Sequence, residues 1–406
     1  MFRTTSLATL VSISLAASLY ATTPSPAQAN GFNDAVTGGQ FKAVLRPRIE
    51  IVDQENFSDN AVATTLRGAF QYTTAPWQGL QLKAELEAVA SLGAETYNSS
   101  TNGQTQYPVV KDPTGGHFNR LFLFHQGTGY TVGGGRDEII YDNARWVGNV
   151  GWRQNHQTFD SIKLDGQSGA LSYHAAYVFT RYSIAQYDRG NDLDNAYFLN
   201  GRYGFDFGKL AAYYYDYGFD GSNTDYRILG AALSGSPGNF VYRAEFANQE
   251  ENNPGTDYSA SYYHLIAGLK VAKMKFLLGY EFLGSDNGNF AVTPHFGTNH
   301  KFNGFADQFL TTPVYGLKDS YLTAVIPFLG NTFVATYHRF QPDSGASFDD
   351  YGSELDLVLA RKLNKQVKLL AKLAAYTADS ANPASDPNTT GKQDVTKLIV
   401  QATYAF

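Results

Sequence analysis

The chain has 406 residues and carries 31 Lys and Arg against 37 Asp and Glu, a formal net charge of −6. This acidic balance argues against nucleic acid as a partner, and the absence of cysteine excludes disulfides, thiol chemistry and thiolate metal sites. The 28 Tyr and 28 Phe residues are a high aromatic load, which is typical of membrane barrels whose aromatic girdles line both interfaces.

The first 29 residues have the pattern of a secretory signal peptide. Arg3 gives a short basic start, residues 7–20 are largely apolar, and Ala27-Gln28-Ala29 is a small-residue cleavage site. We therefore expect residues 1–29 to be removed and residues 30–406 to form one domain. No later stretch holds eighteen consecutive apolar residues, which excludes a helical span and leaves a barrel as the way to cross a membrane.

Alternating side chains begin at residue 41. Within residues 41–52, charged side chains occupy one parity and apolar side chains the other, and residues 63–74 alternate in the same way. In a soluble protein the charged parity would be a solvated exterior, whereas in a membrane barrel it faces the lumen. The basic residues that we expect to line the lumen in these two strands are Lys42, Arg46, Arg48 and Arg67.

The same rhythm of about ten alternating residues and a turn continues to the end of the chain. Short connections alternate with longer ones, as periplasmic turns alternate with outer loops in such barrels. The fold class is therefore all-β, a transmembrane antiparallel barrel with eighteen predicted strands. We place the strands near residues 41–52, 63–74, 80–92, 117–126, 129–140, 158–165, 169–183, 195–207, 208–217, 224–235, 238–249, 258–270, 272–283, 317–328, 331–341, 351–362, 364–377 and 395–406.

Four predicted outer connections are long: residues 93–116, 141–157, 284–316 and 378–394. A barrel of eighteen strands leaves an aqueous channel unless something folds into it. We expect these loops to fold over or into the lumen and to narrow it. Inward basic residues would make the lumen electropositive, and we expect inward acids to pair with them and fix their positions. These acids are Glu85, Glu87, Glu245, Glu281, Glu354 and Asp356.

The densest polar cluster is the segment from Gly135 to Asp160, which contains Arg136, Asp142, Arg145, Arg153 and Asp160. Guanidinium groups bind carboxylates or phosphates through two parallel hydrogen bonds, so these arginines could attract an anionic solute. In the alternative interpretation they pair with Asp142 and Asp160 and brace the loop. Both interpretations stay open, because a braced loop also makes a stable constriction.

This segment resembles the signature of the alginate-export family of outer-membrane proteins. Three further stretches are similar to that family: His300 to Leu310 with Gly316 to Tyr321, Tyr337 to Phe340 with Tyr351 to Leu359, and the carboxyl-terminal QDVTKLIVQATYAF. The resemblance implies an eighteen-stranded barrel that passes an anionic polyuronate. It also implies a lumenal role for Arg136, and more weakly for Arg145, Arg153 and Asp160. Chains that end in a strand with a final Phe, here Phe406, resemble bacterial outer-membrane barrels in general.

We therefore expect an anion-selective channel in the outer membrane of a Gram-negative bacterium, passing an acidic, uronate-type oligo- or polysaccharide by passive diffusion. The alternative is a general or small-anion, organic-acid porin; an outer-membrane hydrolase is a third possibility, but the histidines have no recognisable nucleophile motif beside them. We expect no enzymatic activity, no catalytic residues, no cofactor and no metal site. The expected partners are outer-membrane lipid and the anionic solute, and we expect a monomer.

Overall fold

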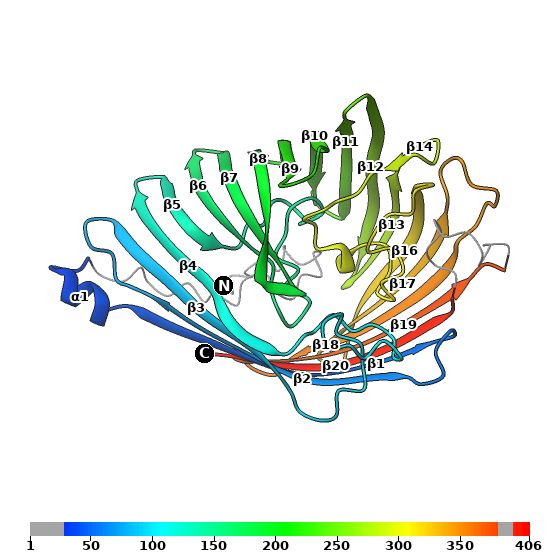
Figure 1. The fold of residues 1–406 in the computed structure, drawn as a ribbon, viewed down its shortest axis with the longest axis horizontal. Coiled ribbons are helices and arrows are strands. Elements are labelled where there is room, and N and C mark those ends of the chain that lie inside the picture. Colours follow the sequence, from blue (N-terminus) through cyan, green and yellow to red (C-terminus); the bar gives the residue numbers. More distant parts are fainter. Residues whose placement is uncertain (1–27, 381–392) are drawn as a thin grey trace.

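The computed structural model describes residues 28–380 and 393–406. Eighteen antiparallel strands form one sheet that closes into a barrel, because β1 pairs with β2 on one side and with β20 on the other (Figure 1). The predicted fold class is confirmed. The barrel strands are β1 (Gln40–Gln54), β2 (Ala61–Thr73), β3 (Leu80–Ser91), β4 (Gly115–Gly127), β5 (Tyr130–Asp137), β6 (Thr158–Ser168), β7 (Leu171–Ser183), β8 (Gln186–Phe205), β9 (Gly208–Phe219), β10 (Asp225–Gly235), β11 (Phe240–Asn253), β12 (Thr256–Val271), β13 (Met274–Leu283), β16 (Leu317–Phe328), β17 (Asn331–Gln341), β18 (Gly352–Lys362), β19 (Val367–Ala378) and β20 (Val395–Ala405).

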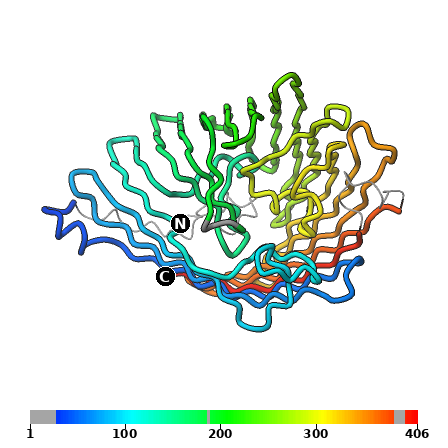
Figure 2. The backbone as a smooth tube through the Cα atoms, viewed as in Figure 1, coloured from blue at the N-terminus to red at the C-terminus, as the bar shows by residue number. Residues whose placement is uncertain are grey.

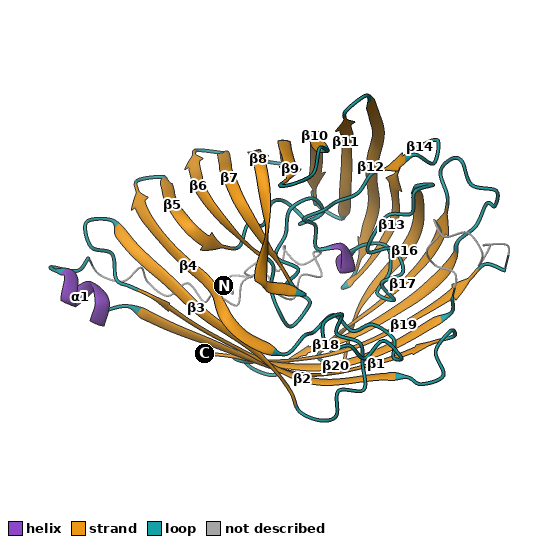
Figure 3. Ribbon diagram, viewed as in Figure 1, coloured by secondary structure: helices purple, strands orange, loops and turns teal. Residues whose placement is uncertain are grey.

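The remaining elements are small and are not part of the wall. The helix α1 (Phe32–Thr37) precedes the first strand, and β14 (Ser285–Asp286) and β15 (Phe290–Ala291) form a hairpin in the connection between β13 and β16. The 3₁₀ turn η1 (Asn299–Lys301) belongs to the same connection (Figure 3). In the described part of the chain no helix is long and apolar enough to cross a membrane.

The wall alternates as a membrane barrel requires. On β1 the side chains of Arg46, Arg48 and Glu50 point inward and are buried, whereas Phe41 and Ile49 point outward and are 55% and 44% exposed. Large apolar side chains are exposed in this way around the whole barrel. Such an exterior suits lipid and not water. Short turns join the strands at one end of the barrel, which we take as the periplasmic end, and the long loops lie at the other.

The strand boundaries differ from the prediction mainly at β8, which begins at Gln186 rather than at residue 195. Residues 188–194, which fall between two of the predicted strands, are part of this strand, and Thr180 and Arg181 of β7 pair with Asp192 and Asn191. Register shifts in the β7–β8 pair allow residues 188–194 to remain hydrogen-bonded in the sheet despite their turn-like sequence. The predicted outer connection 378–394 lies mostly outside the described residues.

Candidate functional site: the lumen and its loops

Three long connections enter the barrel and occupy part of the lumen (Figure 2). They are the β3–β4 loop (residues 92–114), the β5–β6 loop (residues 138–157) and the β13–β16 loop (residues 284–316). Each buries large side chains, of which Tyr97, Trp146 and Phe296 are at most 5% exposed. The prediction that outer loops fold into the lumen is confirmed.

Aromatic packing fixes two of these loops to the wall formed by β6 to β12. The ring of Phe296 lies 4.7 Å from that of Tyr217 and 5.4 Å from that of Phe198, measured between centroids. Trp146 of the β5–β6 loop meets Tyr262 of β12 edge to face at 5.1 Å. Buried aromatic pairs of this kind contribute about 0.5–1.5 kcal/mol each beyond their area. This side of the lumen is therefore filled by protein.

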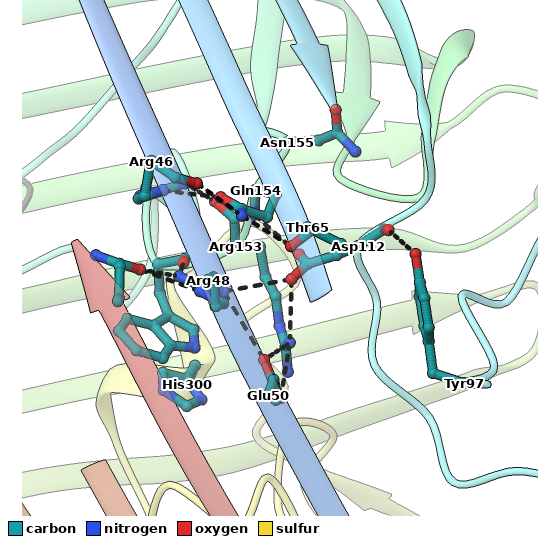
Figure 4. A network of polar contacts seen from close by, with 12 residues as sticks. Arg46, Arg48, Glu50, Thr65, Tyr97, Asp112, Arg153, Gln154, Asn155 and His300 are labelled. Carbon is teal, nitrogen blue, oxygen red and sulfur yellow. Dashed lines mark hydrogen bonds and ion pairs between the residues drawn. The ribbon is translucent and has the colours of Figure 1, made fainter. Parts of the chain in front are cut away.

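On the opposite wall, two arginines of β1 bind the backbone of the β5–β6 loop (Figure 4). Arg46 donates hydrogen bonds to the carbonyl oxygens of Gly151, at 2.9 Å, and of Arg153. Arg48 donates to the carbonyl oxygen of Trp152 and, at 3.3 Å, to the carboxylate of Asp112 in the β3–β4 loop. These guanidinium groups satisfy carbonyls that would otherwise be buried without a donor.

Arg153 ties the β5–β6 loop to both neighbours. Its guanidinium donates to Glu50 of β1 at 3.0 Å and to Asp307 of the β13–β16 loop at 2.7 Å. Burial alone would lower the pKa of Arg153, but Glu50 and Asp307 raise it, so the side chain stays charged. All three side chains are at most 6% exposed, and removing one partner of such a pair leaves a buried charge.

Arg145 also ties the β5–β6 loop to its neighbours, within the part of the lumen that the loops fill. Its Nε lies 2.9 Å from the Glu281 carboxylate of β13, and it donates to Asn303 at 2.9 Å. The ring of Phe302 lies 4.6 Å from the guanidinium carbon. Arg145 is 2% exposed, so it braces the two loops rather than facing open space.

The other residues singled out in the sequence form separate pairs. Arg136 at the end of β5 binds Asp160 of β6 through two hydrogen bonds of 2.9 and 3.2 Å and lies over the ring of Tyr182. Asp142 does not meet these arginines; it binds Arg243 at 2.6 Å and Lys209 at 3.4 Å. The arginines of residues 135–160 thus do not form a single ring. Arg136, Arg145 and Arg153 each form an ion pair with a different carboxylate.

An open cavity of about 880 Å³ remains beside β1, β19 and β20, at the periplasmic half of the lumen. Its roof includes Trp152 of the β5–β6 loop and His300 and Phe305 of the β13–β16 loop. Of the residues predicted to line the lumen, Lys42, Arg46 and Arg67 lie on its surface, whereas Arg48 lies behind its roof. The charged residues on its surface are Lys42, Arg46, Arg67, Glu85, Arg120, Glu138, Asp142, Lys301, Lys365, Lys368 and Lys372.

Lys372 of β19 is one of the most buried cations of this cavity, at 4% exposed. Its ammonium group lies 3.7 Å from the ring centroid of Trp152 and 3.5 Å from that of Phe305, and it donates to Nε2 of His300 at 3.2 Å. Alternation along β19 places Lys372 on the inward face, but its aromatic partners Trp152 and Phe305 come from loops. Lys301 gave no such signal, because it lies in an irregular loop whose path the alternation of strands cannot define.

His300 is held by a carboxylate. Its Nδ1 lies 2.5 Å from Asp307, which also accepts from Arg153 and Lys397, each at 2.7 Å. Burial lowers the pKa of His300 to about 3, so the ring is neutral and its Nε2 accepts from Lys372. Burial would raise the pKa of Asp307, but His300, Lys397 and Arg153 hold it well below its usual value. The His300–Asp307 pair therefore connects the β13–β16 loop to Arg153 of the β5–β6 loop and to Lys397 of β20.

A row of buried acids on β13, β16 and β18 holds the tip of the β13–β16 loop. Backbone amides of Phe305 and Ala306 donate to Asp356 and Glu354 at 3.2 and 2.7 Å. Gly304 has φ of +83°, and a Cβ there would strike Glu354, so only glycine lets the loop approach the wall this closely. Within the described residues, no cluster of three or more His, Asp or Glu side chains could hold a metal ion.

Solved structures share this architecture over nearly the whole chain. Acinetobacter baumannii OccAB2 gives a TM-score of 0.70 at 16% identity, covering 92% of this chain and 99% of its own. Pseudomonas aeruginosa OccD3 (OpdP) gives 0.65 at 13% identity, covering 94% of each chain, and Pseudomonas aeruginosa OccK2 (OpdF) gives 0.66 at 13%, covering 92% and 99%. No protein-family model and no curated protein matches the sequence. At sequence identities this low, the structural similarity establishes the fold of this chain and nothing more.

These structures are Occ/OprD-family outer-membrane channels with eighteen-stranded barrels. The resemblance to the alginate-export family is therefore wrong, because alginate exporters form a different eighteen-stranded family. The predicted location is confirmed: this closed barrel with an apolar exterior lies in the outer membrane of a Gram-negative bacterium.

Proposed function

We propose that the protein is an anion-selective pore for small organic anions such as carboxylates. The observation that carries the proposal is the excess of cations on the cavity surface, where eight Lys and Arg face three Asp and Glu. A cavity lined by one sign of charge, with walls of low dielectric constant, concentrates ions of the opposite sign. The net acidic charge of the whole chain does not alter this local field.

Several of these cations are not neutralised by a carboxylate. Among residues 28–380 and 393–406, Lys365 and Lys368 make no ion pair, and Arg46 binds only carbonyl and amide oxygens. Lys372 rests on the faces of two aromatic rings. By contrast, Arg67 pairs with Glu87, and Arg120 pairs with Glu138. The positive field therefore comes mainly from the β1, β19 and β20 side of the cavity.

The lumen supports a small solute better than a polymer. The loops fill the side of the lumen near β6 to β12, and buried ion pairs fix the roof above the remaining cavity. A polysaccharide needs a continuous wide path, whereas a small anion needs only brief contacts that attract it and release it. Lys368 and Lys372, which are spaced along β19 on the cavity surface, can make such brief contacts with a small anion.

The test is to measure permeability ratios in planar bilayers, with chloride, gluconate and oligouronates as anions. We expect Lys372→Gln and Lys368→Gln to lower the anion-to-cation permeability ratio several-fold. Arg339→Gln is the control, because Arg339 lies at the exposed outer end of β17 and pairs with Asp350. Unchanged selectivity in both lysine variants would overturn the proposal, and oligouronate currents equal to those of gluconate would restore the polymer as a solute.

A further inference from the structure

We propose that the helix α1 is a lipid anchor, which inserts beside the barrel into the phospholipid headgroup region of the inner leaflet. This inference concerns the outside of the protein and does not depend on what passes through the lumen. In Figure 1, α1 extends from the barrel at one edge, next to the start of β1 and the turn between β2 and β3.

Tyr72 shows that α1 lies on the lipid-facing side. On β2 the side chain of Gln71 points inward and is buried, whereas Phe70 points outward and is 43% exposed. Tyr72 has the parity of Phe70, and its hydroxyl donates to the carbonyl oxygen of Val36 at 2.5 Å and accepts from the amide of Gly39 at 2.9 Å. A helix held by an outward side chain lies outside the lumen.

The helix is fixed in this position by its backbone. The carbonyl oxygen of Ala35 accepts a hydrogen bond from the amide of Ala75 at 2.9 Å. Gly39 permits the close approach, since a Cβ at that position would strike the Tyr72 hydroxyl. A six-residue helix has little stability of its own in water, so these contacts and its surroundings must hold it.

The apolar face of α1 is left largely uncovered by the barrel. Phe32, Ala35 and Val36 fall on one side of the helix by their spacing. Ala35 is buried against the barrel, but Phe32 and Val36 are 64% and 44% exposed, and the ring of Phe32 meets that of Trp77 edge to face at 6.0 Å. The three residues between and after them, Asn33, Asp34 and Thr37, form a polar side.

The occupant of this apolar face follows from what lies next to it. Phe41 and Phe406, whose rings are 6.3 Å apart, are 55% and 52% exposed on the outer wall at the same end of the barrel. Phe32 and Trp77 extend this aromatic girdle beyond the strand ends. Aromatic side chains collect at the membrane interface, and an amphipathic helix lies there with its apolar face toward the acyl chains. The continuity of the girdle assigns phospholipid, and not a second protein, to α1.

The experiment moves a tryptophan onto the helix. The chain has only three tryptophans, and Trp146 and Trp152 lie among the lumenal loops, so Trp77→Phe gives a parent whose emission comes from inside the barrel. Adding Phe32→Trp to this parent reports on α1. In vesicles of phosphatidylcholine brominated near the headgroup, we expect the added emission to be lost relative to unbrominated vesicles, whereas the emission of the parent stays unchanged.

Adding Tyr72→Phe, which removes only the hydroxyl that holds α1, is expected to restore part of that emission and to increase its quenching by aqueous acrylamide. Barrel formation is checked independently by heat-modifiable migration on gels. The proposal is overturned if the Phe32→Trp emission is unaffected by brominated lipid and fully quenched by acrylamide, because the helix would then lie in water. It is also overturned if that emission is protected from both quenchers, because a protein surface would then cover the helix.

Discussion

Replacing Arg153 by Met tests whether buried ion pairs hold the roof of the cavity. Arg153 is 4% exposed and is the link between Glu50 of β1 and Asp307 of the β13–β16 loop. Asp307 keeps Lys397 as a partner, but within residues 28–380 and 393–406 Glu50 keeps only Arg48 as an ion-pair partner, at 3.8 Å. Breaking a buried pair by removing one member costs about 3–5 kcal/mol. The replacement leaves the strand ladders intact, so the cost falls on the loop.

A loss of that size raises the population of the detached loop by roughly 10²- to 4 × 10³-fold, since about 1.4 kcal/mol corresponds to a factor of ten. We expect Arg153→Met to raise the single-channel conductance, to add gating noise and to make the β5–β6 loop sensitive to protease, while the barrel still migrates as a folded species. Lys318→Met is the matched control, because Lys318 pairs with Asp343 but is 32% exposed. Conductance and noise equal to those of the wild type would refute the bracing role of Arg153.

Three further predictions follow from the geometry of the lumen. Burial and the neighbouring Arg243 lower the pKa of Lys301 to about 8, so its positive charge is present below pH 8 and lost above it; the anion-to-cation permeability ratio should fall as the pH rises from 7 to 9, and Lys301→Gln should reduce that dependence. Trp152→Ala removes a ring from between Arg48 and Lys372, so conductance should increase and block by aromatic carboxylates should weaken. Arg136→Gln should change stability by less than about 1 kcal/mol in chemical denaturation and leave the conductance unchanged, because the Arg136–Asp160 pair is partly exposed and lies apart from the cavity.

The wall of the barrel could be predicted because its side chains obey one rule. Alternation on β1 places Arg46 inward and Ile49 outward, and any error of one residue would put a charge into lipid. The rule failed at the start of β8, where Arg189, Gly190 and Asn191 have the composition of a turn. Pairing with β7 and the register shifts there override this local preference.

The arrangement of the lumen could be predicted only in part. The expectation that inward acids fix basic residues was correct in kind, as the contacts of Glu281 with Arg145 and of Glu87 with Arg67 show. The partners themselves were not predictable, because Arg145 and Glu281 lie 136 positions apart and meet only through a loop without periodicity. The aromatic surroundings of Lys372 were missed for the same reason.

The sign of the reversal potential of the wild-type channel in a potassium chloride gradient tests the central claim most directly. The cavity has eight cations and three carboxylates on its surface, so chloride should carry most of the current and the potential should lie near the equilibrium potential of chloride. This preference for chloride should weaken as ionic strength rises, because salt screens the field of the lumen. A potential on the potassium side of zero would contradict it.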